Sequence, residues 1–268
     1  MISKISKIDK KLLEACNEKD YEKAVEAIKQ GADVNGWSDN KFFTWTPLKL
    51  ACNNGSPKIA ELLIKAGADV NEAKSLEKTA LMYACENGHL EIVKLLINAG
   101  ANLDKNDYLE TTALIFACLN DNLEIVKLLR KAGADVNLQD KFGRTALMGA
   151  CCCNNLEIAK LLINAGVNLN TQNNDGDTAL MIACCYGNLE IATRLVKAGA
   201  DVNSQDEEGN TALMGACYYG YKEIVKLLID AGANLDIENV EEENALVIAY
   251  ENGYEEIAEL LIDAGATE

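Results

Sequence analysis

Positive charge is scarce in this chain of 268 residues, which has 25 Lys and Arg against 42 Asp and Glu and a formal net charge of −17. A surface with this balance repels phosphate groups, so the composition argues against nucleic acids and anionic membranes as partners. Long apolar runs are missing as well, since none approaches the roughly 18 residues that a membrane-spanning helix needs. We therefore predict a soluble globular protein that binds neither nucleic acid nor membrane.

The N-terminal segment lacks the apolar block of a secretory signal. Residues 1–11 contain four lysines and no apolar run behind them. The ten cysteines are spread over the whole length, and without a signal this favours reduced thiols over a disulfide framework. We expect an intracellular, cytoplasmic protein.

Catalytic signatures are also lacking. His89 is the single histidine, and the sequence contains no GxSxG, HExxH or P-loop string. Many carboxylates recur at fixed positions three or four residues before a Lys or Arg, as Glu91 does before Lys94, and such pairs support solvated helices. We therefore expect no catalytic residues, no cofactor and no enzymatic activity.

What the sequence does contain is a period of 33 residues. Six cysteines keep this spacing: Cys52, Cys85, Cys118, Cys151, Cys184 and Cys217. Glycines recur with the same 33-residue spacing from Gly67 to Gly265. Gly31 precedes Gly67 by 36 residues, because three additional residues are inserted near residues 36–45. A strict period of this length predicts stacked units that bury a shared core, since one unit cannot bury enough apolar surface alone.

Each period contains the pattern of two short helices joined by a tight turn. In residues 79–98, Thr79 is an N-cap candidate for the first helix, and Gly88 can end it in a left-handed turn. The second helix is expected to begin near Leu90 and to end before Gly100. A polar stretch with turn-forming residues then leads to the next unit.

The strings TALMYACENGHLEIVKLLINAGANL (residues 79–103) and TPLKLACNNGSPKIAELLIKAGADVN (residues 46–71) resemble the ankyrin repeat, and the resemblance covers almost the whole chain. The chain departs from the family pattern by having Thr-Ala-Leu-Met in place of Thr-Pro-Leu-His, with proline kept only at Pro47. The resemblance implies an all-α solenoid of about eight stacked helix-turn-helix units with protruding loops or hairpins, in one continuous domain. The predicted units are 1–35 (N-terminal capping repeat), 36–73 (with the longer loop), 74–106, 107–139, 140–172, 173–205, 206–238 and 239–268 (C-terminal capping repeat).

The periodic cysteines are expected to be buried small residues. Neighbouring helices pack about 8 to 10 Å apart, which is too far for disulfides, and the six positions usually hold alanine in the family. Cys152, Cys153 and Cys185 follow at positions that the family uses for partner contact. An alternative is a metal or redox protein built on the clusters Cys151–Cys153 and Cys184–Cys185, although zinc needs four tetrahedral ligands and the main interpretation includes no metal.

The resemblance implies that partners bind to the loop tips and to the inner face of the first helix of each unit. At the loop tips the candidates are Phe43, Trp45, Leu76, Tyr108, Leu109, Phe142, Arg144, Glu207, Glu208, Glu241 and Glu242; on the inner helices they are Tyr83, Phe116, Cys152, Cys153, Tyr186, Tyr218 and Tyr219. Aromatic side chains are enriched in interface hot spots. Packing of Phe43 and Trp45 within their own long loop is the alternative for those two residues.

Negative charge is concentrated at the C-terminal end, where residues 233–268 contain eleven acids and no Lys or Arg. This asymmetry favours a partner with basic flanks, or else serves solubility. We predict a monomeric, non-catalytic protein-protein interaction module that binds an unidentified protein or peptide through a concave groove and loop tips. The alternative in the same class is an acidic inhibitor or immunity-type protein that blocks a basic site on an enzyme or nucleic-acid-binding partner.

Overall fold

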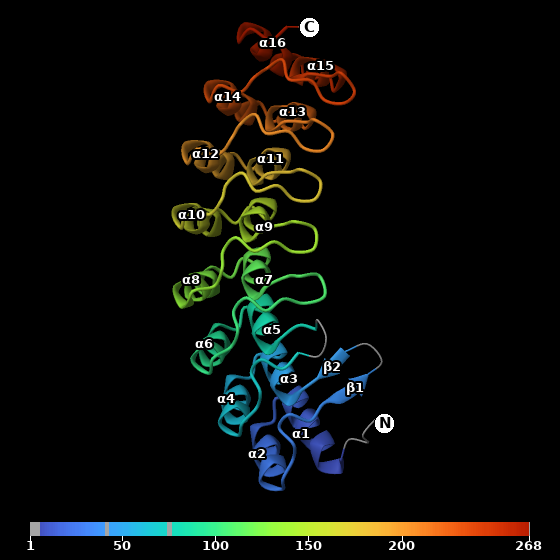
Figure 1. The fold of residues 1–268 in the computed structure, drawn as a ribbon, viewed down its shortest axis with the longest axis vertical. Coiled ribbons are helices and arrows are strands. Elements are labelled where there is room, and N and C mark those ends of the chain that lie inside the picture. The colour runs from blue at the N-terminus through green and yellow to red at the C-terminus, as the bar shows by residue number, and fades with distance from the viewer. Residues whose placement is uncertain (1–5, 41–42, 74–76, 268) are drawn as a thin grey trace. The chain divides into compact units, whose positions relative to one another are not determined.

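The computed structural model describes residues 6–40, 43–73 and 77–267, which form sixteen helices and one short hairpin (Figure 1). The described residues belong to two compact units, Met1–Leu138 and Gln139–Glu268. The first unit contains α1 (Lys7–Glu18), α2 (Tyr21–Lys29), β1 (Ser38–Asn40), β2 (Phe43–Trp45), α3 (Pro47–Asn53), α4 (Pro57–Lys65), α5 (Ala80–Glu86), α6 (Leu90–Asn98), α7 (Ala113–Leu119) and α8 (Leu123–Ala132). The second contains α9 (Ala146–Cys152), α10 (Leu156–Asn164), α11 (Ala179–Cys185), α12 (Leu189–Lys197), α13 (Ala212–Tyr218), α14 (Lys222–Asp230), α15 (Ala245–Glu251) and α16 (Glu255–Asp263).

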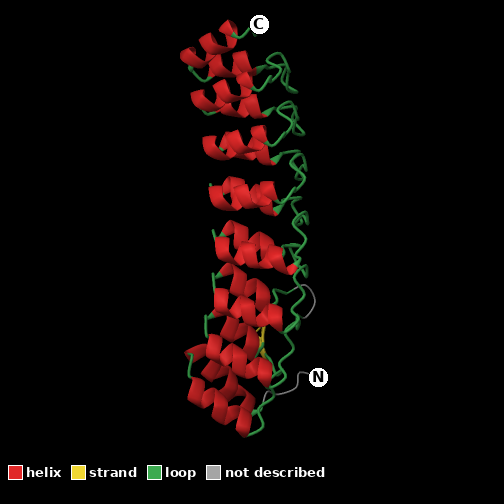
Figure 2. Ribbon diagram, turned by 90° about the vertical axis from the view of Figure 1, so that its left-hand side faces the viewer, coloured by secondary structure: helices red, strands yellow, loops and turns green. Residues whose placement is uncertain are grey.

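Helix pairs stack on one another within each unit, and the loops that connect successive pairs lie along one side of the helices (Figure 2). This confirms the predicted all-α repeat solenoid. A short β-hairpin is added to the helices in the longer loop, where three residues are inserted. Its strands β1 and β2 pair antiparallel, with Ser38 opposite Trp45. One helix pair falls in each predicted range, while the repeat boundaries and the single continuous domain stay predictions.

Threonine caps most of the first helices, as predicted for Thr79. Thr79 Oγ1 accepts a hydrogen bond from the Met82 backbone N–H at 3.2 Å, and Met82 Sδ accepts one from the Thr79 N–H at 3.3 Å. Methionine thus closes the capping box from the position where the family has histidine, with sulfur as a weak acceptor. The same box recurs at Thr145, Thr178 and Thr211.

The helix ends also match the predicted ones. The second helix of this pair begins at Leu90, and Gly88 in the turn before it has a φ of 73°. Leucines on the second helices contribute to the core. One leucine on each of the helices α4, α6, α8, α10, α12, α14 and α16 is fully buried: Leu63, Leu96, Leu129, Leu162, Leu195, Leu228 and Leu261. The helices in the described ranges are all too short or too polar to cross a membrane.

All six periodic cysteines are fully buried, which confirms the packing interpretation. Burial raises the pKa of each of these thiols, to about 12 for Cys217. Since the thiolate is the reactive form, these groups are poor nucleophiles at neutral pH. Cys152 and Cys153 are exposed and Cys185 is half-buried.

This arrangement predicts the reactivity of the thiols. In the folded protein an aromatic disulfide reagent should label Cys152 and Cys153 quickly and Cys185 slowly, because burial raises the pKa of Cys185 to about 11. The remaining seven of the ten cysteines should react only after unfolding. Rapid labelling of more than three thiols under native conditions would contradict this burial pattern, and the denatured protein supplies the full count.

Candidate functional site

In the first unit two of the predicted aromatic residues, Trp45 and Tyr83, pack against each other. The rings of Trp45 and Tyr83 lie 4.9 Å apart between centroids at a tilt of 30°, so the end of β2 rests on α5. Lys78 Nζ lies 4.1 Å from the centroid of the Phe116 ring and 2.8 Å from Glu86 Oε1. Burial raises the pKa of Tyr83 to about 12. These half-buried rings contribute internal packing as well as surface.

The loops of this unit place the other candidates separately. Leu76 lies outside the described residues, as does the side chain of Phe43. Tyr108 is exposed and Leu109 is half-buried at the tip before α7. The Asp107 carboxylate holds this tip by accepting hydrogen bonds from the backbone N–H groups of Leu109 and Thr111, at 2.9 and 3.0 Å.

The second unit begins with a similarly ordered tip. Asp140 is buried and accepts hydrogen bonds from the backbone N–H groups of Phe142 and Arg144, each at 2.9 Å. Arg144 Nη2 also lies 2.7 Å from Asp140 Oδ2, and its guanidinium sits 4.9 Å from the centroid of the exposed Phe142 ring. The tip therefore presents a ring and a cation in a fixed arrangement.

Exposed tyrosines gather at the C-terminal ends of α11 and α13. Tyr186, Tyr218 and Tyr219 are 59%, 54% and 50% exposed. The rings of Tyr218 and Tyr219 meet edge to face at 4.9 Å, and Tyr219 stacks on Tyr221 at 6.1 Å. A hydrogen bond with Cys152 is the main cause that raises the pKa of Tyr186. Cys152 and Cys153, at the end of α9 in the same unit, are exposed as well.

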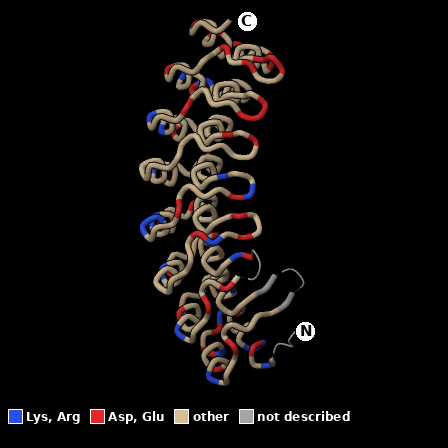
Figure 3. Tube along the Cα trace, viewed as in Figure 1, with Lys and Arg blue, Asp and Glu red and all other residues tan. Residues whose placement is uncertain are grey.

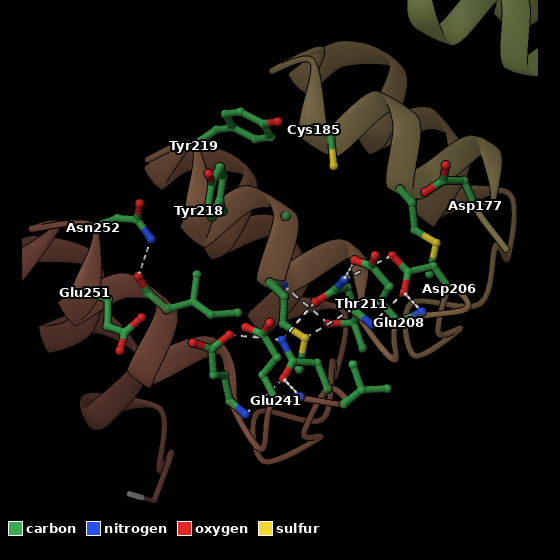
Figure 4. Close-up of a pocket in the computed structure, with 18 residues that line it drawn as sticks. Asp177, Cys185, Asp206, Glu208, Thr211, Tyr218, Tyr219, Glu241, Glu251 and Asn252 are labelled. Carbon is green, nitrogen blue, oxygen red and sulfur yellow. Dashed lines mark hydrogen bonds between the residues drawn. The ribbon is translucent and has the colours of Figure 1, made fainter. Parts of the chain in front are cut away.

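A pocket of about 590 Å³ opens beside Tyr218 and Tyr219, between α11, α13, α15 and the loops that precede α13 and α15 (Figure 4). Its apolar lining includes Met181, Met214 and Ile248. Six carboxylates also line it: Asp177, Asp206, Glu208, Glu241, Glu243 and Glu251. The acidic loop tips that contribute to it are visible in Figure 3. The pocket therefore combines apolar surface, aromatic rings and negative charge.

Some of these carboxylates hold the loops in place. Asp206 accepts hydrogen bonds from the backbone N–H groups of Glu208 and Asn210, at 2.9 and 2.7 Å. Burial, followed by the charges of Asp206 and Asp175, raises the pKa of Asp177. Burial is the main cause that raises the pKa of Cys185, and the negative charges of Asp177 and Asp206 raise it further. The cavity side of α11 is thus strongly electronegative.

The structure brings together only part of the predicted set. Tyr218, Tyr219, Glu208 and Glu241 line the pocket, whereas Glu207 and Glu242 are not among its lining residues. Sequence reasoning did not select Asp177, Met181, Met214 or Gly215. At the position of Gly215 five other repeats have a larger residue, namely Leu50, Tyr83, Phe116, Ile182 and Ile248, but the repeat of α9 also has a glycine, Gly149, so this position alone does not locate the pocket.

The capped helix pairs and the ordered loop tips define a helical-repeat protein. The family model for ankyrin repeats (3 copies) matches residues 12–107, 69–140, 114–206 and 198–267, and the chain belongs to this family. No curated protein matches the chain. Ankyrin repeats generally mediate protein-protein interaction and are typically non-catalytic.

Proposed function

We propose that this chain is a non-catalytic module that binds a protein or peptide through the first helices of its second unit and the adjoining loop tips. The observation that carries this proposal is the group of exposed tyrosines, Tyr186, Tyr218 and Tyr219, beside a pocket. Each tyrosine offers a large apolar contact and a polar hydroxyl, which is the combination that interfaces favour.

The rigidity of the repeat supports this role. The tyrosines stand on capped helices, and Asp206 fixes the loop beside them through backbone hydrogen bonds. A surface that is ordered before the partner arrives loses little conformational entropy on binding, so more of the contact energy is left as affinity. A monomer in a reducing cytoplasm is the form that we propose, in keeping with the burial of seven of the ten cysteines as thiols in the repeat core.

Selection of ligands from an unbiased random peptide library tests the proposed surface. Peptides that bind the full chain should lose affinity by at least about tenfold when Tyr218→Ala and Tyr219→Ala are combined, because two hot-spot aromatics are removed. Tyr250→Ala is the matched control, since Tyr250 is also 50% exposed and lies on α15 away from the pocket lining. The proposed binding surface would be contradicted if all selected peptides bound the double variant with unchanged affinity while its thermal stability was preserved.

The acidic loop tips favour a second candidate function, an inhibitor that covers a basic site. Glu207, Glu208, Glu241 and Glu242 are exposed on neighbouring tips. A ligand held by these charges should bind far more weakly as ionic strength rises, whereas a ligand held by the tyrosines should depend little on salt. The same library-selected ligands distinguish the two modes by their affinities at low and high salt.

A further inference from the structure

Gly215 allows a close approach of two neighbouring helices at the wall of the pocket in the second unit. Gly215 stands in the middle of α13, where the neighbouring helices α11 and α15 have Ile182 and Ile248 at the equivalent positions. A Cβ atom at Gly215 would lie 2.6 Å from Cys185 Sγ, so the Cys185 thiol occupies the space beside this glycine. The pocket is also lined by the thioether side chains of Met181 and Met214, and its volume is about 590 Å³.

The charge around this space has one sign. Six carboxylates line the pocket, and among the described residues no Lys or Arg does so. Asn210 and Asn239 engage Asp206 and Glu243 by hydrogen bonds at 3.3 and 3.1 Å. The carboxylates of Glu241 and Glu251 are exposed, and no side chain in the described part of the chain is paired with them (Figure 4). An occupant that brings a positive charge would complement this rim.

We propose that this pocket binds the side chain of one lysine or arginine carried by a partner protein segment. The aliphatic stem would lie on Met181, Met214 and Ile248, as the stems of long basic side chains commonly cover apolar surface. The cationic head would reach the carboxylates of Glu241 and Glu251. The inference rests on the proposed function and specifies what kind of residue the surface recognises.

The tyrosines add selectivity for a cation. The edge-to-face pair of Tyr218 and Tyr219 borders the pocket, and the face of a phenol ring attracts ammonium and guanidinium groups. An acidic side chain would be repelled by the rim, and a neutral apolar one would leave the carboxylates without a counter-charge. Charge and shape therefore favour the same occupant.

Methionine methyl groups provide a local readout. The chain has five methionines, of which Met181 and Met214 line the pocket, while Met82 and Met148 hold the equivalent place in α5 and α9 and do not. We would label the methionine methyls of the full chain with carbon-13 and titrate it with the acetylated and amidated peptide Gly-Gly-Lys-Gly-Gly. Matched peptides carry arginine or norleucine in place of the lysine, the latter keeping the stem but not the charge.

The lysine and arginine peptides should give saturable shifts of the Met181 and Met214 methyl signals, with Met82 and Met148 unmoved. Glu241→Gln combined with Glu251→Gln should weaken binding by at least about fivefold, because two counter-charges are lost. The control is Glu255→Gln with Glu259→Gln, which removes the same charge from α16 outside the pocket. Gly215→Ile should abolish the shifts, because its side chain would displace the Cys185 thiol and change the pocket wall. The retained fold of this variant is checked on the Met82 and Met148 signals.

Equal shifts with the norleucine peptide would overturn the proposal, as would equal weakening by the α16 control or saturable shifts caused by calcium chloride but not by the lysine peptide. The library selection separates this failure from that of the proposed function. Selected ligands that depend on Tyr218 and Tyr219 but contain no Lys or Arg would keep the binding surface and reject the basic occupant. Enrichment of a single basic residue at one place in the ligands would support both.

Discussion

Replacing Glu72 and Glu77 together by glutamine is expected to lower the free energy of unfolding by about 3 kcal/mol. Lys49 lies on α3 with its side chain only 2% exposed, and its Nζ is 3.0 Å from Glu72 Oε2 and 3.3 Å from Glu77 Oε2. Glutamine keeps the size of each side chain but removes its charge, so the buried ammonium would lose the negative charges of two carboxylates that face it. Urea denaturation of the full chain, followed by circular dichroism, measures the effect.

Two further variants make the interpretation specific. Glu91→Gln removes the carboxylate of an exposed pair, with Lys94 Nζ at 2.7 Å, and should cost no more than about 0.5 kcal/mol. Adding Lys49→Met to the double variant should recover most of the loss, because Met82 occupies the same place in α5 and an apolar side chain needs no counter-charge. A double variant that is no less stable than Glu91→Gln would show that the buried pairs contribute no more than a surface pair.

Lys49 also marks the limit of what periodicity predicts. The 33-residue spacing is enough to predict the helix pairs, the cap at Thr79 and the burial of the cysteines, because these features repeat with the backbone. The same rule makes the Lys49 position apolar. The burial of Lys49 depends on Glu72 and Glu77, which belong to the following loop. The pattern of a single repeat does not show that these carboxylates lie next to the Lys49 ammonium.

The candidate site was predictable in the same partial way. The residue varies among the repeats at the positions of Tyr218, Tyr219, Glu208 and Glu241, so the sequence could identify these positions as ones with little structural duty. The pocket itself needs side chains from three successive helices and from the loops before two of them, which a single-repeat pattern does not show to be neighbours. Whether a variable ring stays exposed also depends on its neighbours: Tyr218 remains exposed, whereas Tyr83 is half-buried against Trp45.

Gly176→Ala is expected to destabilise the second unit by about 3 kcal/mol or more, because it combines backbone strain with a clash. Gly176 has a φ of 86°, and a Cβ atom there would lie 2.5 Å from the backbone N of Glu207 and 2.7 Å from Cα of Asp206. The Glu207 N–H donates to the Asp175 carbonyl at 3.0 Å. Since the neighbours are backbone atoms rather than flexible side-chain ends, one loop must move away from the next to accept the methyl group.

Gly166→Ala separates the two causes. Gly166 also has a positive φ, 76°, but a Cβ atom there would meet nothing within 4 Å, so only the strain of about 1 kcal/mol applies. Equal losses for the two variants in urea denaturation would contradict the close approach of the loops. Because the loop of Glu207 also carries Asp206 and Glu208 on the pocket rim, Gly176→Ala should weaken the lysine peptide as well, while Gly166→Ala should leave its affinity unchanged. The packing of successive loops and the binding surface would then depend on the same glycine.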